Sequence, residues 1–158
     1  MPDIPLPEDL STYIRSMESR IRALETAPRA QDTSLPWSYS IVDPNESTVS
    51  TTATDLATYG PEIIATVGQS GRVFINAGAY MNPVYGAVGY VHLYIDGAYY
   101  RDILAFGSDP TSQIVGSVAT TRVVTGLSAG SHTFTMKYLT NGFAAVNFAA
   151  RFLTVQAF

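Results

Sequence analysis

The stretch Gly89-Tyr-Val-His-Leu-Tyr-Ile-Asp-Gly97 decides the fold of this chain. Every second residue in it is aliphatic, which is the period of a β-strand with one buried face. The aliphatic residues are Val91, Leu93 and Ile95, and the residues between them are Tyr90, His92 and Tyr94. Asp96-Gly97 ends the run with a dipeptide that adopts the positive φ of a two-residue hairpin. The stretch therefore predicts a strand that turns directly into an antiparallel neighbour.

Similar alternations separated by turn residues fill the rest of the chain after residue 36. Strands are expected near 37–42, 47–54, 62–67, 72–80, 89–95, 98–106, 114–124, 131–140 and 143–155. Asn141-Gly142 predicts a second two-residue hairpin. Short strands at this spacing predict an antiparallel β-sandwich or jelly roll over residues 37–158.

Several of these strands are apolar on both faces, whereas a sheet with one wet face alternates apolar and polar residues. In one strand, Val73, Ile75, Ala77 and Ala79 oppose Phe74, Asn76 and Tyr80, and in the last, Val146, Phe148, Ala150 and Phe152 oppose Ala149, Leu153 and Val155. Aromatic residues with little charge are typical of contacts between subunits. The candidate interface consists of Phe74, Tyr80, Tyr90, His92 and Tyr94. The alternative is a wet face that tolerates tyrosine.

Between Pro7 and Pro28 the apolar period is that of a helix. Leu10, Ile14, Met17, Ile21 and Leu24 are spaced by 4, 3, 4 and 3 residues, which keeps one apolar seam towards a partner helix. Arg20 and Glu25 fall at heptad positions g and e, where opposite charges pair between parallel helices. The pattern resembles the short trimerisation motif of parallel three-stranded coiled coils. It predicts a trimeric coiled coil, with a helix docked on its own β-domain as the alternative.

The predicted organisation has three parts. Residues 1–27 form an N-terminal anchor segment and the coiled-coil helix, residues 28–36 form a polar linker with proline at both ends, and residues 37–158 form the β-sandwich head. Charge is uneven along the chain: residues 1–36 hold ten charged side chains, and the other 122 residues hold twelve. A head so poor in charge has few groups that favour a hydrated surface. This composition favours burial of part of that surface between subunits.

Composition excludes several classes of function. A net charge of -4 argues against nucleic acid as a partner, because binding needs a basic surface. The chain has no cysteine, so it has neither disulfides nor a thiolate metal site. No apolar run approaches membrane-spanning length, and the N-terminus lacks the pattern of a signal peptide.

No catalytic constellation stands out. Two histidines, His92 and His132, are too few for a zinc site of three ligands within one chain, and no pair of carboxylates is singled out for glycoside hydrolysis. Three copies of His92 on a trimer axis could hold an ion, but a hydrogen-bonded interface residue is the simpler interpretation. Neither a cofactor nor a metal is expected. A further candidate site is a sugar-stacking platform at Tyr85, Tyr99 and Tyr100, with ordinary turn and strand-edge tyrosines as the alternative.

The sequence also resembles virion proteins of phages that infect actinobacteria, in which a short coiled coil precedes a β-domain. The resemblance lies in four stretches: 6–29, with the phrase Leu24-Glu-Thr-Ala-Pro28; Ser50 to Gly60; Val124 to Tyr138; and Ala150 to Val155. It implies a non-enzymatic homotrimer in the virion, as a tail-associated fibre or tip protein or a capsid-decorating spike, attached to other virion proteins through its N-terminal segment. The alternative function is a lectin-like head that recognises a host surface glycan.

Overall fold

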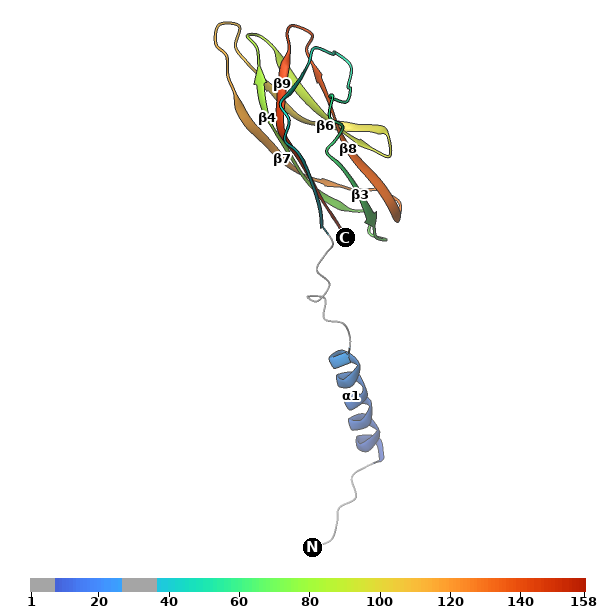
Figure 1. Cartoon of the computed structure of the whole chain (residues 1–158). Helices are drawn as coiled ribbons and strands as arrows, with labels where there is room; N and C mark the ends of the chain where they lie inside the picture. Colours follow the sequence, from blue (N-terminus) through green and yellow to red (C-terminus); the bar gives the residue numbers. More distant parts are fainter. Residues whose placement is uncertain (1–7, 27–36) are drawn as a thin grey trace. The chain divides into compact units, whose positions relative to one another are not determined.

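The computed structural model describes residues 8–26 and 37–158. These residues belong to two compact units, Met1–Ser34 and Leu35–Phe158. Figure 1 shows the helix of the first unit and the strands of the second. The predicted anchor segment before the helix and the predicted linker after it lie outside the described residues.

A single helix, α1 (Glu8–Thr26), is the described part of the first unit. In the sequence, Pro7 comes directly before the helix and two acidic residues, Glu8 and Asp9, begin it, which is a composition typical of a helix start. The predicted helix is therefore confirmed. Among the described residues, no helix combines the length and the apolar character that a membrane crossing needs.

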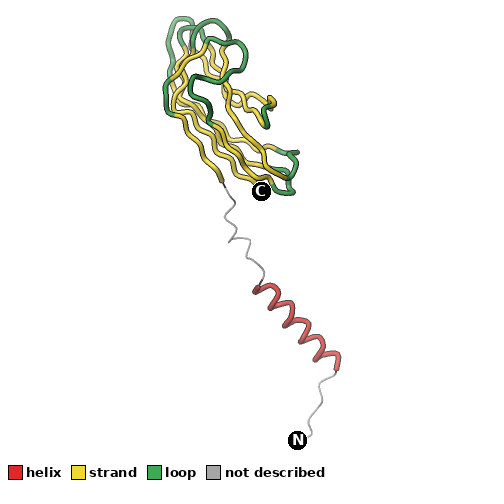
Figure 2. The backbone as a smooth tube through the Cα atoms, turned by 45° about the vertical axis from the view of Figure 1, so that its right-hand side comes forward, coloured by secondary structure: helices red, strands yellow, loops and turns green. Residues whose placement is uncertain are grey.

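The second unit is a sandwich of two antiparallel sheets. One sheet has the order β1-β9-β4-β7, with β2 also paired to β9, and the other has the order β3-β8-β5-β6. This order is that of a jelly roll, in which the chain repeatedly crosses between sheets. Figure 2 shows the loops gathered at the two ends of the strands. The strands are β1 (Trp37–Val42), β2 (Glu46–Thr48), β3 (Glu62–Val67), β4 (Val73–Pro83), β5 (Val88–Ile95), β6 (Ala98–Gly107), β7 (Gly116–Val124), β8 (Gly130–Thr140) and β9 (Val146–Ala157).

The core lies between the sheets and follows the predicted alternation. In β5, Val91 and Leu93 are fully buried, whereas Tyr90, His92 and Tyr94 are partly exposed. In β4, Val73, Ile75, Ala77 and Ala79 face the core, as expected. The opposite sheet contributes large side chains such as Phe134 and Tyr138 from β8. The mainly β fold and the sandwich are thus confirmed for the described residues.

The two expected hairpins had different outcomes. Asp96 and Gly97 have φ of 53° and 77° and join β5 to β6, so this hairpin is confirmed. The hairpin at Asn141 is wrong, because β8 and β9 belong to different sheets and the chain crosses the sandwich here. Asn141 instead secures the crossing through its side chain: Oδ1 accepts hydrogen bonds from the N–H groups of Val88 and Phe143, each at 3.2 Å.

The strand expected over 47–54 is largely wrong. Only Glu46–Thr48 pairs with β9 as β2, and the following segment rejoins a sheet at one bridge between Thr54 and Tyr138. The Ser50 hydroxyl donates to the carbonyl oxygen of Thr52 at 2.6 Å. Such local side-chain bonds compete with strand pairing, which explains why a stretch rich in Ser and Thr leaves the sheet.

The predicted assignment of residues to the two faces of the last strand is right for the first half of the strand and wrong for the second half. Gly78 of β4 pairs with Phe152 but Tyr80 pairs with Ala149, so β9 has one extra residue between them. Ala150 in this bulge has a φ of 44°. Because an extra residue reverses the side-chain phase, Phe152 points outward, and Arg151, Leu153 and Val155 point into the core.

Candidate functional site

The outward face of the β1-β9-β4-β7 sheet has no charged side chain on these four strands. We call this surface the uncharged face. Its cross-strand rows are Trp37-Gln156-Phe74-Val123, Tyr39-Thr154-Asn76-Thr121 and Ile41-Phe152-Gly78-Ala119, with Tyr80 and Ser117 below them. Trp37 is 70% exposed and Tyr39 is 59% exposed. Exposed aromatic side chains on a surface without charge are typical of an interaction site.

A groove of about 430 Å³ lies in the uncharged face, lined by Trp37, Tyr39, Asn76, Phe152 and Thr154. The ring of Phe152 lies directly over Gly78, since a Cβ added to Gly78 would come within 2.4 Å of Phe152 Cε1. The absence of a side chain at Gly78 therefore leaves the space that the Phe152 ring occupies at the groove.

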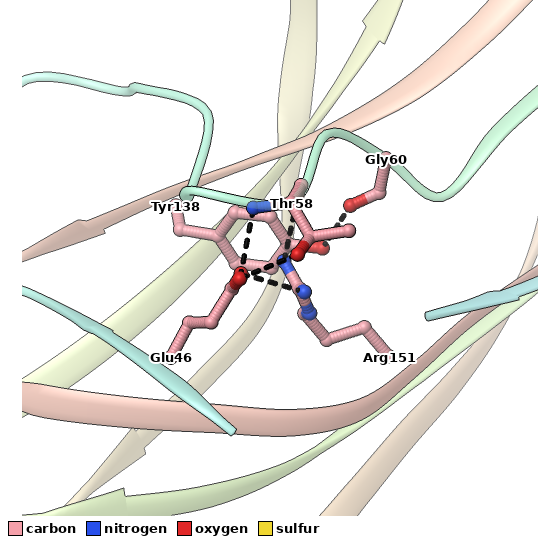
Figure 3. Close-up of polar contacts among 5 residues, drawn as sticks. All are labelled: Glu46, Thr58, Gly60, Tyr138 and Arg151. Atoms are coloured by element: carbon pink, nitrogen blue, oxygen red, sulfur yellow. Dashed lines mark hydrogen bonds and ion pairs between the residues drawn. The ribbon is translucent and has the colours of Figure 1, made fainter. Parts of the chain in front are cut away.

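The bulge in β9 that turns Phe152 outward also turns Arg151 inward, where its side chain is fully buried. Figure 3 shows the contacts of this guanidinium group. Nη2 donates to Glu46 Oε2 at 2.9 Å and Nη1 donates to the Thr58 carbonyl at 3.3 Å. The guanidinium carbon lies 5.2 Å from the centre of the Tyr138 ring.

The partners of Arg151 are themselves held in place. Glu46 Oε1 accepts hydrogen bonds from the N–H of Thr58 at 2.8 Å and from its hydroxyl at 2.6 Å. Burial raises the pKa of Glu46, but the Thr58 hydrogen bonds and the Arg151 charge outweigh it, so the net pKa is lowered. Tyr138 donates to the Gly60 carbonyl at 3.0 Å, and burial raises its pKa. These contacts connect β2, β9 and the loop before β3. The role of the Arg151 network is therefore structural.

The outward face of the other sheet carries a polar and aromatic group that we call the β5–β6 cluster: His92, Tyr94, Tyr99 and Asp102. Asp102 Oδ1 is 2.8 Å from His92 Nε2 and accepts a hydrogen bond from the Tyr99 hydroxyl at 2.9 Å. The Tyr99 ring lies 5.1 Å from the His92 ring and 6.0 Å from the Tyr94 ring, between centroids.

Lys137 of β8 borders this cluster, since it pairs with His92 across β8 and β5. Its Nζ lies 5.3 Å from the centre of the Tyr94 ring and 3.2 Å from Asp55 Oδ2. A cation over a tyrosine ring is attracted by the ring quadrupole. The cluster thus has a positive group at one side and the Asp102 carboxylate at the other.

The second histidine fixes the tip of the β5–β6 hairpin. His132 Nδ1 is 2.6 Å from Asp96 Oδ2, and Nε2 is 2.9 Å from the Ser128 carbonyl oxygen. Because both ring nitrogens face acceptors, the protonated imidazole is favoured. The hydrogen bond to Asp96, followed by the bond to Ser128, raises the pKa of His132. In Asp96 the pKa is lowered, first by the Thr133 N–H and then by His132.

The predicted coiled-coil seam falls partly within the described residues. Leu10, Ile14, Met17 and Ile21 are all exposed on α1, at 40–50%. The side chains of Leu24 and Glu25 lie outside the described residues. Pairing of Arg20 with Glu25 of another copy stays a prediction.

The five residues of the predicted head interface do not form one surface within a chain. Phe74 and Tyr80 belong to the uncharged face, whereas Tyr90, His92 and Tyr94 lie on the outward face of the opposite sheet. The reason is topological: β4 and β5 are consecutive strands, but the chain crosses the sandwich between them. Sequence alternation identified outward residues correctly but not the sheet to which each strand belongs.

The predicted sugar platform is also divided. Tyr85 precedes the first residue of β5, whereas Tyr99 pairs with Tyr94 near the end of that strand. Eight residues of strand separate these ends by roughly 25 Å. Tyr100 lies at a register shift beside Tyr99. Asp102 was missed, because a spacing of three residues in a regular strand would place it on the face opposite Tyr99.

No family model and no curated protein matches this sequence. Solved structures resemble it in fold alone. VP2 of infectious bursal disease virus, in a subviral particle, has a TM-score of 0.51 and 12% identity over 77% of this chain and 32% of the viral chain. The TNF protein Eiger from S. frugiperda has a TM-score of 0.48 and 11% identity, over 78% of this chain and 93% of Eiger.

A sugar-binding protein, the C-terminal domain of EclA, matches over 98% of this chain and all of its own, with a TM-score of 0.40 and 11% identity. The matches therefore include a viral capsid protein and a sugar-binding domain. The class that the fold defines is a jelly-roll β-sandwich. Among the described residues, no group of three or more His, Cys, Asp or Glu is placed to hold a metal ion.

Proposed function

We propose that this chain is a non-enzymatic homotrimeric virion protein, either a tail-associated fibre or tip protein or a capsid-decorating spike. The single observation that carries the proposal is the uncharged face. Exposed tryptophan and tyrosine on a surface without charge are costly in water and are stabilised by burial. Burying the exposed part of Trp37 contributes roughly 3 kcal/mol, at about 25 cal/mol per Å² of apolar surface.

The helix is a second argument that the uncharged face is covered by other copies of this chain. α1 carries Ile14, Met17 and Ile21 at the spacing of the predicted seam, and these side chains are 44–50% exposed in a single copy. Ten residues separate Thr26 from Trp37, a length of at most about 35 Å when extended. Three chains joined at their helices would therefore hold three uncharged faces at high effective concentration.

Membership of a virion is supported by the resemblance of the N-terminal and head stretches to phage virion proteins. The fold likeness to a capsid protein is consistent with it, since a jelly roll of this class serves in a viral particle there. In this proposal the N-terminal segment binds other virion proteins and the head projects outward.

The test of the trimer is a mass measurement by light scattering on the full chain and on two variants. Wild type is expected at about 51 kDa, three times the 17.0 kDa of one chain. Tyr39→Glu adds a charge to the uncharged face and is expected to weaken the trimer. Ile64→Glu is the matched control, because Ile64 is 65% exposed on the outward face of the other sheet.

A wild-type mass of one chain, or equal behaviour of the two variants, would overturn the proposed interface. The virion assignment has its own test: gold-labelled antibody against this protein should decorate purified particles of the phage that encodes it. Particles without label, together with the protein in the unsedimented fraction of the lysate, would overturn the assignment.

A further inference from the structure

The head's two outward faces differ in chemistry. The uncharged face has no charged side chain, whereas the face formed by β3, β8, β5 and β6 carries Glu62, Lys137, His92 and Asp102. In the proposed trimer the second face is the one left to meet solvent and other molecules. The β5–β6 cluster lies on it and has no part in the proposed assembly.

Two irregularities of β6 aim the Asp102 carboxylate at the cluster. The pairing of β5 with β6 shifts register between Leu93 and Tyr94 and again between Val91 and His92. As a result Tyr99 lies opposite Tyr94 and Asp102 lies opposite His92, on the same face. Bulges that re-aim a side chain are over-represented at functional sites.

The Asp102 carboxylate is oriented by the protein and still available. Tyr99 and His92 both contact Oδ1, and no hydrogen bond to Oδ2 is found among the described residues. The Asp102 side chain is 61% exposed. An oriented carboxylate oxygen with a free lone pair is a strong acceptor for hydroxyl groups, and its fixed position lowers the entropy cost of binding.

The aromatic part of the cluster is rigid as well. Tyr99 is 54% exposed, yet its ring contacts the rings of His92 and Tyr94 and its hydroxyl is bonded to Asp102. A tyrosine held in this way offers an apolar ring face beside polar groups at low entropic cost. Three residues lie side by side on the neighbouring strands β8, β5 and β6 and span roughly 10 Å: Lys137, His92 and Asp102.

We propose that the β5–β6 cluster binds a saccharide. The C–H face of a sugar ring packs on Tyr99, hydroxyl groups donate to Asp102 Oδ2, and Lys137 donates to a further ring substituent. The combination of an exposed ring, an oriented carboxylate and a cation within the width of three strands matches a ligand that is apolar on its faces and hydroxylated at its edges. The site is complete within one chain, so it does not depend on the trimer.

Saturation-transfer NMR on the full chain tests this, with N-acetylglucosamine, galactose, mannose and arabinose as probes, supplemented by an array of bacterial surface glycans. Transfer to ring protons of at least one probe is expected. Tyr99→Ala and Asp102→Asn should each weaken binding about tenfold or more. Tyr85→Ala is the control, because Tyr85 is equally exposed but lies beyond the far end of β5. Asp102→Asn keeps the size of the side chain and guards against misfolding of the Tyr99 variant.

Binding of none of the probes or array glycans would overturn the inference, and so would transfer that survives both cluster variants. The masses of the same samples separate this site from the proposed assembly. Sugar binding by a monomer would contradict the proposed trimer and support the saccharide site. A trimer that binds no sugar would support the proposed assembly and contradict the saccharide site.

Discussion

Removal of Glu46 should be far more damaging than removal of the arginine that it pairs with. The Arg151 side chain is fully buried, and the Glu46 side chain is 14% exposed. Glu46→Ala leaves the guanidinium charge with only the Thr58 carbonyl and the Tyr138 ring, and breaking a buried pair in this way costs about 3–5 kcal/mol. Domains of this size are stable by about 5–15 kcal/mol, so the loss is a large share of the total.

Arg151→Met removes the buried charge together with its desolvation cost. Glu46 keeps both hydrogen bonds from Thr58, and a flexible methionine fills the vacated space. Arg151→Met is therefore expected to cost less than Glu46→Ala, because the Glu46 carboxylate that remains keeps two hydrogen bonds and is 14% exposed, whereas Glu46→Ala leaves a fully buried charge. The reasoning is supported only if Glu46→Ala lowers the free energy of unfolding clearly more than Arg151→Met does.

Urea unfolding followed by circular dichroism, at one fixed protein concentration, measures both free energies. Glu62→Ala is the matched control, since Glu62 is an exposed carboxylate that accepts one hydrogen bond, from Tyr59 at 2.7 Å. Its expected cost is below about 1 kcal/mol. The reasoning fails if Glu46→Ala costs no more than Glu62→Ala, or if Arg151→Met costs as much as Glu46→Ala.

Two further predictions concern the hairpin tip and the uncharged face. Because the pKa of His132 is raised and that of Asp96 is lowered, the pair should stabilise the head most between about pH 4 and pH 6.5, and its contribution should fade as pH rises through the His132 pKa. Asp96→Asn should flatten the dependence of Tm on pH above pH 6; an unchanged profile would contradict this. Gly78→Ala should push the Phe152 ring off the sheet and destabilise by about 1–3 kcal/mol, more than Gly116→Ala in urea unfolding; equal costs would refute the close packing.

The strands were predictable because burial of one face imposes a period of two on the sequence. The runs around Val91 and Ile75 show this period without interruption, and Asp96-Gly97 has a dipeptide chemistry that suits a tight hairpin. The local order of β-structure therefore followed from short-range patterns. The helix between Pro7 and Pro28 was predictable from its own apolar spacing of 3 and 4 residues and from the prolines at both ends.

The sites were less predictable, because they depend on single inserted residues and on long-range pairing. Ala150 gives no sequence signal for a bulge, yet it decides that Phe152 joins the uncharged face and that Arg151 enters the core. Arg151 and Glu46 are 105 residues apart, so only the packed sandwich brings them together. Asp102 joins Tyr99 through a register shift that alternation alone would have contradicted.

The emission of Trp37 tests the central claim most directly. It is the one tryptophan in the chain, it is 70% exposed in a single copy, and it lies at the edge of the uncharged face. If three copies meet through this face, the emission should be blue-shifted and protected from iodide at working concentration, and should become red-shifted and quenchable in Ile14→Asn/Ile21→Asn upon dilution. Emission typical of a fully hydrated tryptophan in the wild type at every concentration would contradict the account.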